Sequence, residues 1–186
     1  MILRLRYASI RSMDISNGEG VGVALFVQGC PSPQCKGCFN PETWDFNGGK
    51  EWTQNIKKTL FRLIDRDYIK RVSILGGEPL ATQNLNDILD LITEIKNKYS
   101  NKTVWIYSGY TWNQIMHPIV TDDFNLKRDE TIHKRREIVS LCDVLVDGRY
   151  IESQRDITLK WRGSKNQRVI DIQQSLKQNT IVLYCD

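Results

Sequence analysis

Long hydrophobic runs are missing from this sequence. The longest apolar stretch near its start, residues 21–27, is much shorter than the about 20 residues that a membrane-spanning helix needs. Arg4 and Arg6 stand close to the N-terminus with no long apolar stretch behind them, which is not the pattern of a secretory signal peptide. Internal repeats and flexible linkers are also lacking. We therefore expect a protein that neither enters a membrane nor is exported.

A strong excess of one charge is lacking too. The 26 Lys and Arg residues against 22 Asp and Glu residues give a net charge of +4, which is too small to indicate nucleic-acid binding. Hydrophobic residues make up 40% of the chain and charged residues 26%, which excludes intrinsically disordered and low-complexity classes. A chain of this length buries roughly 70% of its unfolded surface, and we expect a single domain over residues 1–186.

Cysteine is present five times, and its distribution is uneven. An odd number of cysteines argues against a disulfide framework and favours the reducing cytoplasm. Three of them, Cys30, Cys35 and Cys38, fall within nine residues of one another. The other two, Cys142 and Cys185, stand alone, and we predict that both are small buried apolar side chains.

Hydrophobic patterning indicates alternating strands and helices. Short, apolar, β-branched segments predict strands at residues 22–28, 71–75, 103–107 and 143–146. Apolar residues at helical spacing predict helices at residues 53–66, 85–98 and 129–142. This alternation is typical of an α/β fold with a mostly parallel sheet. A complete barrel of βα units takes about 250 residues, so we expect a partial (βα) barrel or an open α/β sheet.

Polar or glycine-rich turns follow each of the four predicted strands. In either kind of fold, active sites lie at the carboxyl ends of the parallel strands. We therefore expect these turns to meet at one edge of the sheet. They are, in chain order, the cysteine loop, Gly76-Gly77-Glu78-Pro79, Ser108-Gly109-Tyr110 and Asp147-Gly148.

The three clustered cysteines suggest a metal centre with an open position. Three thiolates hold three irons of a four-iron cluster, whereas such clusters are normally closed by four cysteines. An open coordination position admits a small ligand. The alternative is a zinc site in which the fourth ligand is Cys142, Cys185, His117 or His133. Structural zinc sites usually take a second ligand pair from another turn, and this chain has no second pair.

Several motifs, spread from about residue 14 to residue 170, make the sequence resemble a known family. The motifs are Leu25-Phe26-Val27-Gln28-Gly29-Cys30, Cys38-Phe39-Asn40, Thr43-Trp44, Gly76-Gly77-Glu78-Pro79, Leu145-Val146-Asp147-Gly148-Arg149 and Trp161-Arg162-Gly163-Ser164-Lys165-Asn166-Gln167. With these motifs the sequence resembles the radical S-adenosylmethionine (SAM) enzymes and, within them, the activating enzymes of anaerobic ribonucleoside-triphosphate reductase. The last motif is the one most specific to that family.

The resemblance implies a specific chemistry. Cys30, Cys35 and Cys38 would bind a [4Fe-4S] cluster, and SAM would chelate the open iron through its amino and carboxylate groups. One electron, supplied by a flavodoxin-like donor, would split SAM into methionine and a 5′-deoxyadenosyl radical. That radical would take a hydrogen atom from a glycine Cα on the large subunit of the reductase. No catalytic side chain is implied beyond the cluster and SAM.

The resemblance also implies a set of cofactor-binding residues. The backbone at Gly37 and Phe39 would lie near the adenine, and Gly76 and Gly77 would let the backbone approach the methionine end of SAM. Glu78 would orient that turn or contact the ammonium group. Ser108 would hydrogen-bond SAM, and Asp147 would lie near its carboxylate or a bound cation. The competing interpretations are plain strand-end turns for these residues and core packing for Phe39.

Four residues of the last motif, Trp161, Arg162, Asn166 and Gln167, are expected either to bind the partner or to support the SAM pocket. The chain also departs from the family pattern in two places. Four residues, rather than three, separate Cys30 from Cys35, and two prolines among them make the turn stiff enough for a cis Ser32–Pro33 bond. A polar segment near residues 117–130 is interpreted as a surface insertion.

Two other functions remain possible from the sequence. A radical SAM enzyme acting on a small molecule, such as a deazapurine precursor, would share the cysteine loop and the Gly-Gly-Glu turn but would lack the motif at residues 161–167. A zinc-binding interaction module would contain zinc and no iron.

Overall fold

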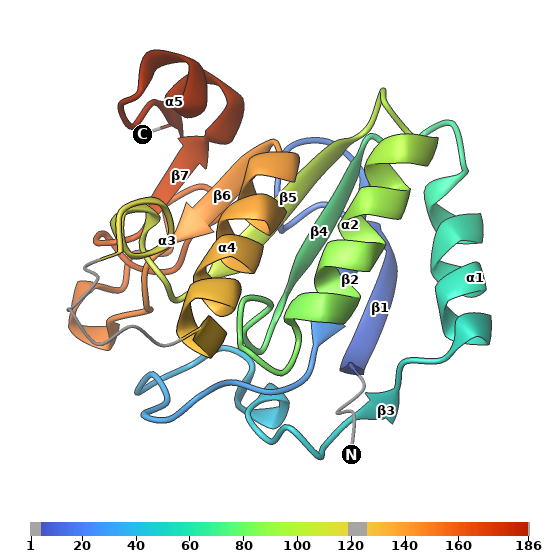
Figure 1. Cartoon of the computed structure of the whole chain (residues 1–186), viewed down its shortest axis with the longest axis horizontal. Helices are drawn as coiled ribbons and strands as arrows, with labels where there is room; N and C mark the ends of the chain where they lie inside the picture. The colour runs from blue at the N-terminus through green and yellow to red at the C-terminus, as the bar shows by residue number, and fades with distance from the viewer. Residues whose placement is uncertain (1–4, 119–125, 186) are drawn as a thin grey trace.

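The fold is built on one mixed sheet whose strands follow the order β3-β1-β2-β4-β5-β6-β7-β8 (Figure 1). The computed structural model describes residues 5–118 and 126–185. The four central strands run parallel to one another and correspond to the four predicted strands. They are β2 (Gly22–Val27), β4 (Arg71–Gly76), β5 (Thr103–Ser108) and β6 (Val144–Asp147). Within the described residues the sheet does not close on itself, and the fold is α/β with a parallel central part.

Antiparallel strands, which the sequence did not predict, extend the sheet on both sides. On one side β1 (Arg6–Asp14) pairs with β2 and with the short β3 (Lys50–Glu51). On the other side β7 (Arg168–Asp171) pairs with β6 and with β8 (Leu183–Cys185). These outer strands are short or half-exposed, and they therefore lack the continuous apolar pattern of the buried central strands.

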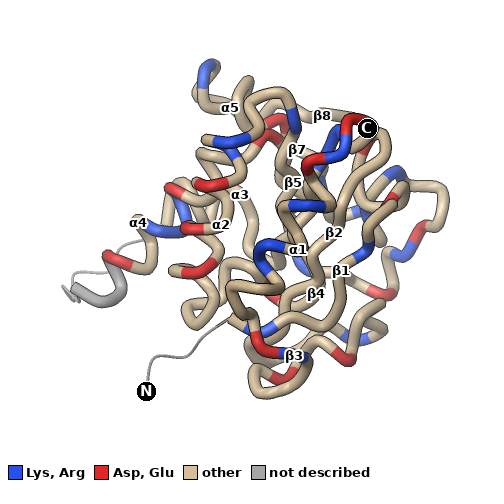
Figure 2. The backbone as a smooth tube through the Cα atoms, turned by 90° about the vertical axis from the view of Figure 1, so that its right-hand side faces the viewer, with Lys and Arg blue, Asp and Glu red and all other residues tan. Residues whose placement is uncertain are grey.

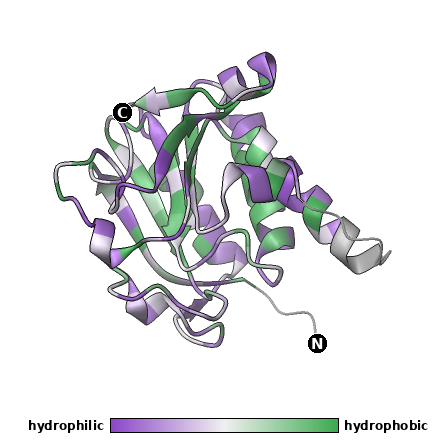
Figure 3. Ribbon diagram, turned by 90° about the vertical axis from the view of Figure 1, so that its left-hand side faces the viewer, coloured by the Kyte–Doolittle hydropathy of each residue, from purple (hydrophilic) through white to green (hydrophobic). Residues whose placement is uncertain are grey.

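The helices cover one face of the sheet (Figure 1). The three predicted helices are present within a few residues of their expected bounds, as α1 (Gln54–Ile64), α2 (Leu85–Lys98) and α4 (Leu126–Leu141). The shorter α3 (Trp112–Met116) and α5 (Ile172–Gln178) were not predicted. Apolar side chains of the central strands and of α1 and α2 form the main core between the two layers, and Figure 3 shows hydrophobic residues along these strands.

Aromatic side chains cover part of the opposite face of the sheet. Trp105 of β5 packs with Val144, Val146 and Val169. The Trp161 ring lies edge-on to the Trp105 ring, with centroids 4.9 Å apart. The motif at residues 161–167 therefore begins with a residue that is anchored on the sheet.

Two further expectations concern the surface. Of the expected insertion near residues 117–130, residues 119–125 lie outside the described residues, and the backbone of residues 126–130 belongs to α4. None of the described helices is long and apolar enough to cross a membrane. Figure 2 shows acidic and basic residues interspersed along the chain rather than separated by sign.

A buried arginine fixes the edge of the sheet opposite the predicted site. Arg71, at the start of β4, is fully buried, and its Nη2 lies 3.0 Å from Oδ1 and 2.8 Å from the backbone oxygen of Asp14. Its Nη1 donates to the backbone oxygen of Asn17 at 2.6 Å. The guanidinium group thus holds the loop after β1 against the sheet, and the charge of Asp14 is compensated inside the protein.

Replacing this arginine tests the importance of the buried pair. Arg71→Leu should lower the free energy of unfolding by about 3–5 kcal/mol, because a buried carboxylate loses its cationic partner. Chemical denaturation measures the loss. Arg11→Leu is the matched control, since Arg11 is a mostly exposed second partner of the same Asp14 carboxylate, at 3.9 Å, and its loss should cost no more than about 1 kcal/mol. Equal losses in the two variants would contradict the account.

Candidate functional site

The four polar turns lie at one edge of the sheet, as predicted. Parallel pairing sets Val27 of β2 opposite Gly76 of β4, and Ser108 of β5 opposite Asp147 of β6. The carboxyl ends of neighbouring central strands are therefore level with one another, and the turn that follows each strand begins at the same edge.

The cysteine loop is fastened where it leaves β2. The Gly29 N–H donates to the backbone oxygen of Thr43 at 2.8 Å, and the Cys30 N–H donates to that of Trp44 at 3.0 Å. The loop between Cys30 and Thr43 therefore leaves the edge of the sheet and returns to it at the same place. Within it, the Ser32–Pro33 peptide bond is cis, as the sequence suggested.

The three thiols of this loop share one electrostatic environment. The pKa of Cys30 is raised to about 11, mainly by burial and in addition by the negative charges of Glu78, Cys35 and Cys38, while the Arg149 guanidinium opposes the rise. Arg149 also donates a hydrogen bond to the backbone oxygen of Pro33, inside the loop. Three neighbouring sulfur atoms with a cation beside them suit an anionic metal cluster, which needs thiolate ligands.

The described residues offer no tetrahedral zinc site around these cysteines. No group of three or more Cys, His, Asp or Glu side chains among them is arranged to hold a metal ion. Thiolates bind the irons of a four-iron cluster at separate corners of a cube, and so the three sulfur atoms do not need to converge on one point.

The two isolated cysteines differ in burial. Cys142 is buried in the main core, as predicted, and its Sγ donates to the backbone oxygen of Ile138 at 3.2 Å. Cys185 is only half-buried, because it lies on the outer strand β8, so its predicted burial is wrong in degree.

The Gly76-Gly77-Glu78 turn packs directly against the start of the cysteine loop. The Gly77 N–H donates to the Val27 oxygen at 2.9 Å, and the Glu78 N–H donates to the Gly29 oxygen at 2.7 Å. A Cβ atom at Gly77 would lie 2.4 Å from the Gly29 oxygen, and Gly76 has a φ of 106°. Glycine is required at this turn because the backbones of the two loops meet there. This requirement is separate from any need for close approach of a cofactor.

Glu78 joins this turn to the turn after β5. Its buried carboxylate accepts hydrogen bonds from the Leu80 N–H at 2.9 Å, the Ser108 hydroxyl at 2.8 Å and the Gly109 N–H at 2.7 Å. Burial raises the pKa of Glu78, while these hydrogen bonds favour its charged form. Of the two roles expected for Glu78, the contacts support the orientation of the turn.

Asp147 joins the turn after β6 to β7 and α3. Its buried carboxylate accepts from the Arg168 Nε at 2.9 Å and from the Trp112 N–H at 2.7 Å. This pairing raises the pKa of Arg168. Sequence reasoning missed Arg168, although it directly follows the most specific motif. The available signal was the position of Asp147 directly after a predicted buried strand, because a carboxylate in such a place needs a cationic partner.

The motif at residues 161–167 holds the turn that contains Arg149. The Gln167 side chain accepts from the Gly163 N–H at 2.9 Å and donates to the Gly148 oxygen at 2.9 Å. The Asn166 side chain donates to the Arg149 oxygen at 2.8 Å. The buried Arg162 Nε has no hydrogen-bond partner among the described residues.

Phe39 lies outside the core, contrary to one of the two interpretations of its role. Its side chain is 58% exposed, and its ring lies edge-on to that of Tyr150, with centroids 5.0 Å apart. Gly37, two residues earlier, contacts Glu152: a Cβ atom at Gly37 would lie 2.9 Å from the Glu152 carboxyl group. The cysteine loop therefore packs against the segment that follows β6.

Comparison with known proteins agrees with this geometry. Residues 16–170 match a family model described as a 4Fe-4S single cluster domain. The chain is 35% identical over 167 residues to the anaerobic ribonucleoside-triphosphate reductase-activating protein of Escherichia coli (strain K12), covering 89% of this chain and 97% of that protein. The chain belongs to the family of anaerobic ribonucleoside-triphosphate reductase-activating proteins. The family resemblance seen in the motifs is thereby confirmed.

Two other members of this family have similar sequence identity to the chain. The reductase-activating protein of Vibrio cholerae is 34% identical over 165 residues, which cover 88% of this chain and 96% of that protein. The protein of the same name from Enterobacteria phage T4 is 33% identical over 165 residues, covering 89% and 93% of the two chains. The 4Fe-4S match includes the whole cysteine loop with its longer first gap.

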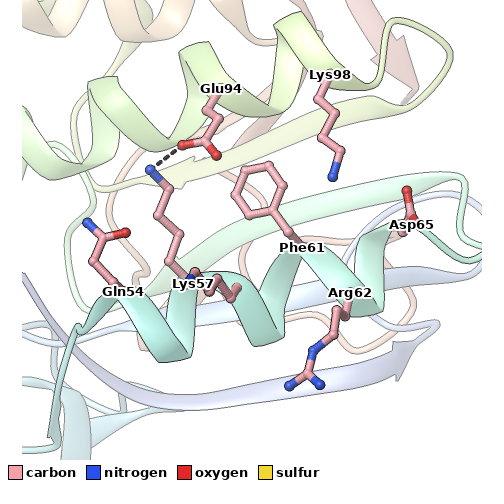
Figure 4. A pocket seen from close by; sticks show the side chains of 8 residues that line it. Gln54, Lys57, Phe61, Arg62, Asp65, Glu94 and Lys98 are labelled. Atoms are coloured by element: carbon pink, nitrogen blue, oxygen red, sulfur yellow. Dashed lines mark ion pairs between the residues drawn. The ribbon is translucent and has the colours of Figure 1, made fainter.

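A cavity of about 460 Å³ lies between α1 and α2, away from these turns (Figure 4). Its lining mixes basic and acidic side chains, and Lys57 forms an ion pair with Glu94 there. None of the predicted site residues lines it. The lining residues are Gln54, Lys57, Lys58, Phe61, Arg62, Asp65, Glu94 and Lys98.

The bridging role of Gln167 can be tested by substitution. Gln167→Leu should lower the free energy of unfolding by about 1–3 kcal/mol, because the Gly163 N–H and the Gly148 oxygen lose their partner in a half-buried place. Hydrogen exchange at Gly163 should also become faster. Lys165→Leu, in the same motif but exposed, should change neither quantity. Unchanged exchange at Gly163 in the Gln167 variant would show that its hydrogen bonds do not hold the turn.

Proposed function

We propose that this protein activates the anaerobic ribonucleotide reductase by generating a glycyl radical on its large subunit. The observation that carries this proposal is the loop with three neighbouring thiols, set beside a Gly-Gly-Glu turn at the carboxyl edge of a parallel sheet. The chain also spans nearly the full length of relatives that are named for activating the reductase. The protein acts as an oxidoreductase of the radical SAM class.

Cys30, Cys35 and Cys38 would hold three irons of a [4Fe-4S] cluster, and SAM would occupy the fourth. When bound and reduced, the cluster would supply the electron that splits SAM, and this chemistry would remove a hydrogen atom from a glycine Cα of the reductase. Arg149 lies close enough to affect the Cys30 thiol and contacts the loop at Pro33. Its positive charge favours the thiolate forms that bind iron.

The residues expected to bind SAM divide into two groups. Gly37, Phe39, Gly76 and Gly77 offer backbone at the edge of the cysteine loop and of the adjoining turn, which suits close approach of a cofactor. Glu78, Ser108 and Asp147 already hold neighbouring turns through their side chains. We assign these three a positioning role: they fix the backbone that SAM contacts.

The open sheet fits a protein substrate. We propose that residues 1–186 form a single radical SAM domain, a partial (βα) barrel whose open side admits a polypeptide loop of the reductase. The electron would come from a flavodoxin-like donor, and the odd cysteine count favours a cytoplasmic location. We expect no nucleic acid among its partners, since the net charge is only +4.

Cysteine variants test the cluster assignment. Cys35→Ala and Cys38→Ala should each abolish cluster assembly, because each removes an anionic ligand that no neighbour replaces. Iron and sulfide analysis with visible absorption after anaerobic reconstitution measures the loss. Cys185→Ala, on the outer strand β8, is the matched control and should keep the full cluster. A full cluster and SAM cleavage in either of the first two variants would refute the assignment.

The activity itself is tested with the reductase present. Under anaerobic reducing conditions, the reconstituted protein should convert SAM to 5′-deoxyadenosine and give the reductase a glycyl radical signal in electron paramagnetic resonance. A protein that binds iron but never forms 5′-deoxyadenosine would contradict the proposal. Turnover of a small molecule without any reductase would favour the alternative radical SAM function instead.

A further inference from the structure

An apolar surface borders the cysteine loop. It consists of Phe39, Ile151 and Ile157, whose side chains are 58%, 39% and 85% exposed, together with Arg155. We call these four residues the rim patch. Phe39 directly follows Cys38, and the other three residues belong to the segment after β6. Exposed apolar side chains that gather beside a reactive site are typical of a surface that another molecule covers.

The rim patch is held in place by specific contacts. The Arg155 guanidinium lies over the Phe39 ring, 5.7 Å from its centroid, and the Phe39 ring also packs on Tyr150. A Cβ atom at Gly163 would lie 2.6 Å from the Phe39 ring, so the ring lies directly against the Gly163 backbone. Phe39 is therefore fixed against the segment after β6 although its ring remains exposed.

The two parts of the patch are also joined through charged and backbone groups. Lys36 of the cysteine loop lies 3.9 Å from the Glu152 carboxylate. Arg155 and Ser164 form an isolated antiparallel bridge, and the Asp156 N–H donates to the Gly163 oxygen at 3.2 Å. Ile157 therefore directly follows a pair of residues that is tied to the 163–164 segment, and the neighbouring Arg155 contacts the Phe39 ring.

We propose that the rim patch is the docking surface for the glycine-bearing polypeptide segment of the reductase, an inference that rests on the function proposed above. A hydrogen atom can be transferred only between groups in contact, so the substrate segment must lie against the edge that carries Cys38. The first side chain after Cys38 on that edge is the exposed Phe39. Aromatic residues and arginine are among the residue types enriched in protein interfaces, and the rim patch sets Phe39 beside Arg155.

The exposed apolar residue Ile15 does not share this position. Ile15 is 73% exposed, but it follows Asp14, which pairs with Gly22 at the start of β2. It therefore lies at the edge of the sheet opposite the cysteine loop. A polypeptide that reaches the cluster through the rim patch leaves Ile15 uncovered, and Ile15 can serve as a matched control.

The test compares Ile157→Asp with Ile15→Asp in the full-length, anaerobically reconstituted protein. Glycyl radical yield is measured against reductase concentration, and 5′-deoxyadenosine formation is measured without reductase, with dithionite as the electron source. Ile157→Asp should raise the half-saturating reductase concentration at least tenfold, because a charge replaces an apolar contact. It should leave partner-free SAM cleavage unchanged. Ile15→Asp should match the unsubstituted protein in both measurements.

The outcomes separate this inference from the proposed function. If the half-saturating reductase concentration is the same in all three proteins, the rim patch is not the docking surface, although the proposed activity still stands. If Ile157→Asp instead weakens only the reaction driven by a flavodoxin-like donor, and not that driven by dithionite, the patch binds the donor and the inference is wrong. If the unsubstituted protein cleaves SAM but raises no glycyl radical, the proposed function fails and the inference falls with it.

Discussion

The buried carboxylate of Glu78 holds together the turns on which the whole site depends. Its two oxygens accept three hydrogen bonds that link the turn after β4 to the turn after β5. Its backbone N–H donates to the Gly29 oxygen and so links both turns to the root of the cysteine loop. A buried carboxylate is costly unless its hydrogen-bonding capacity is used. Because these donors use it, Glu78 fixes three strand ends relative to one another.

A second set of bonds fixes the other half of the same edge. Asp147 holds Arg168 and the first turn of α3, while Gln167 holds the backbone of Gly148. Arg149, in that turn, touches the cysteine loop at Pro33. These residues of the family motifs therefore serve largely to hold the backbone of neighbouring turns in place. This arrangement suits an enzyme whose reactive chemistry comes from a cluster and SAM, since the protein supplies placement and protection.

Much of the fold could be predicted from the sequence because its centre is regular. The buried strands β2, β4, β5 and β6 are short and mostly apolar, and α2 was predicted with its observed bounds. The outer strands carry no such pattern, and so they were missed. Within the site, spacing identified the cysteines and the turns, but the partners of Glu78 and Asp147 come from residues distant in sequence. Such pairs become visible only when the strands are placed side by side.

The most direct test of the account is the Mössbauer spectrum of protein reconstituted with ⁵⁷Fe, recorded with and without SAM. Three cysteine ligands leave one iron of a four-iron cluster without a protein ligand, and SAM would bind at that iron. The account therefore predicts a four-iron cluster in which SAM shifts the signal of a single iron and leaves the others unchanged. A cluster whose spectrum does not respond to SAM, or a colourless protein that takes up no iron and sulfide, would contradict it.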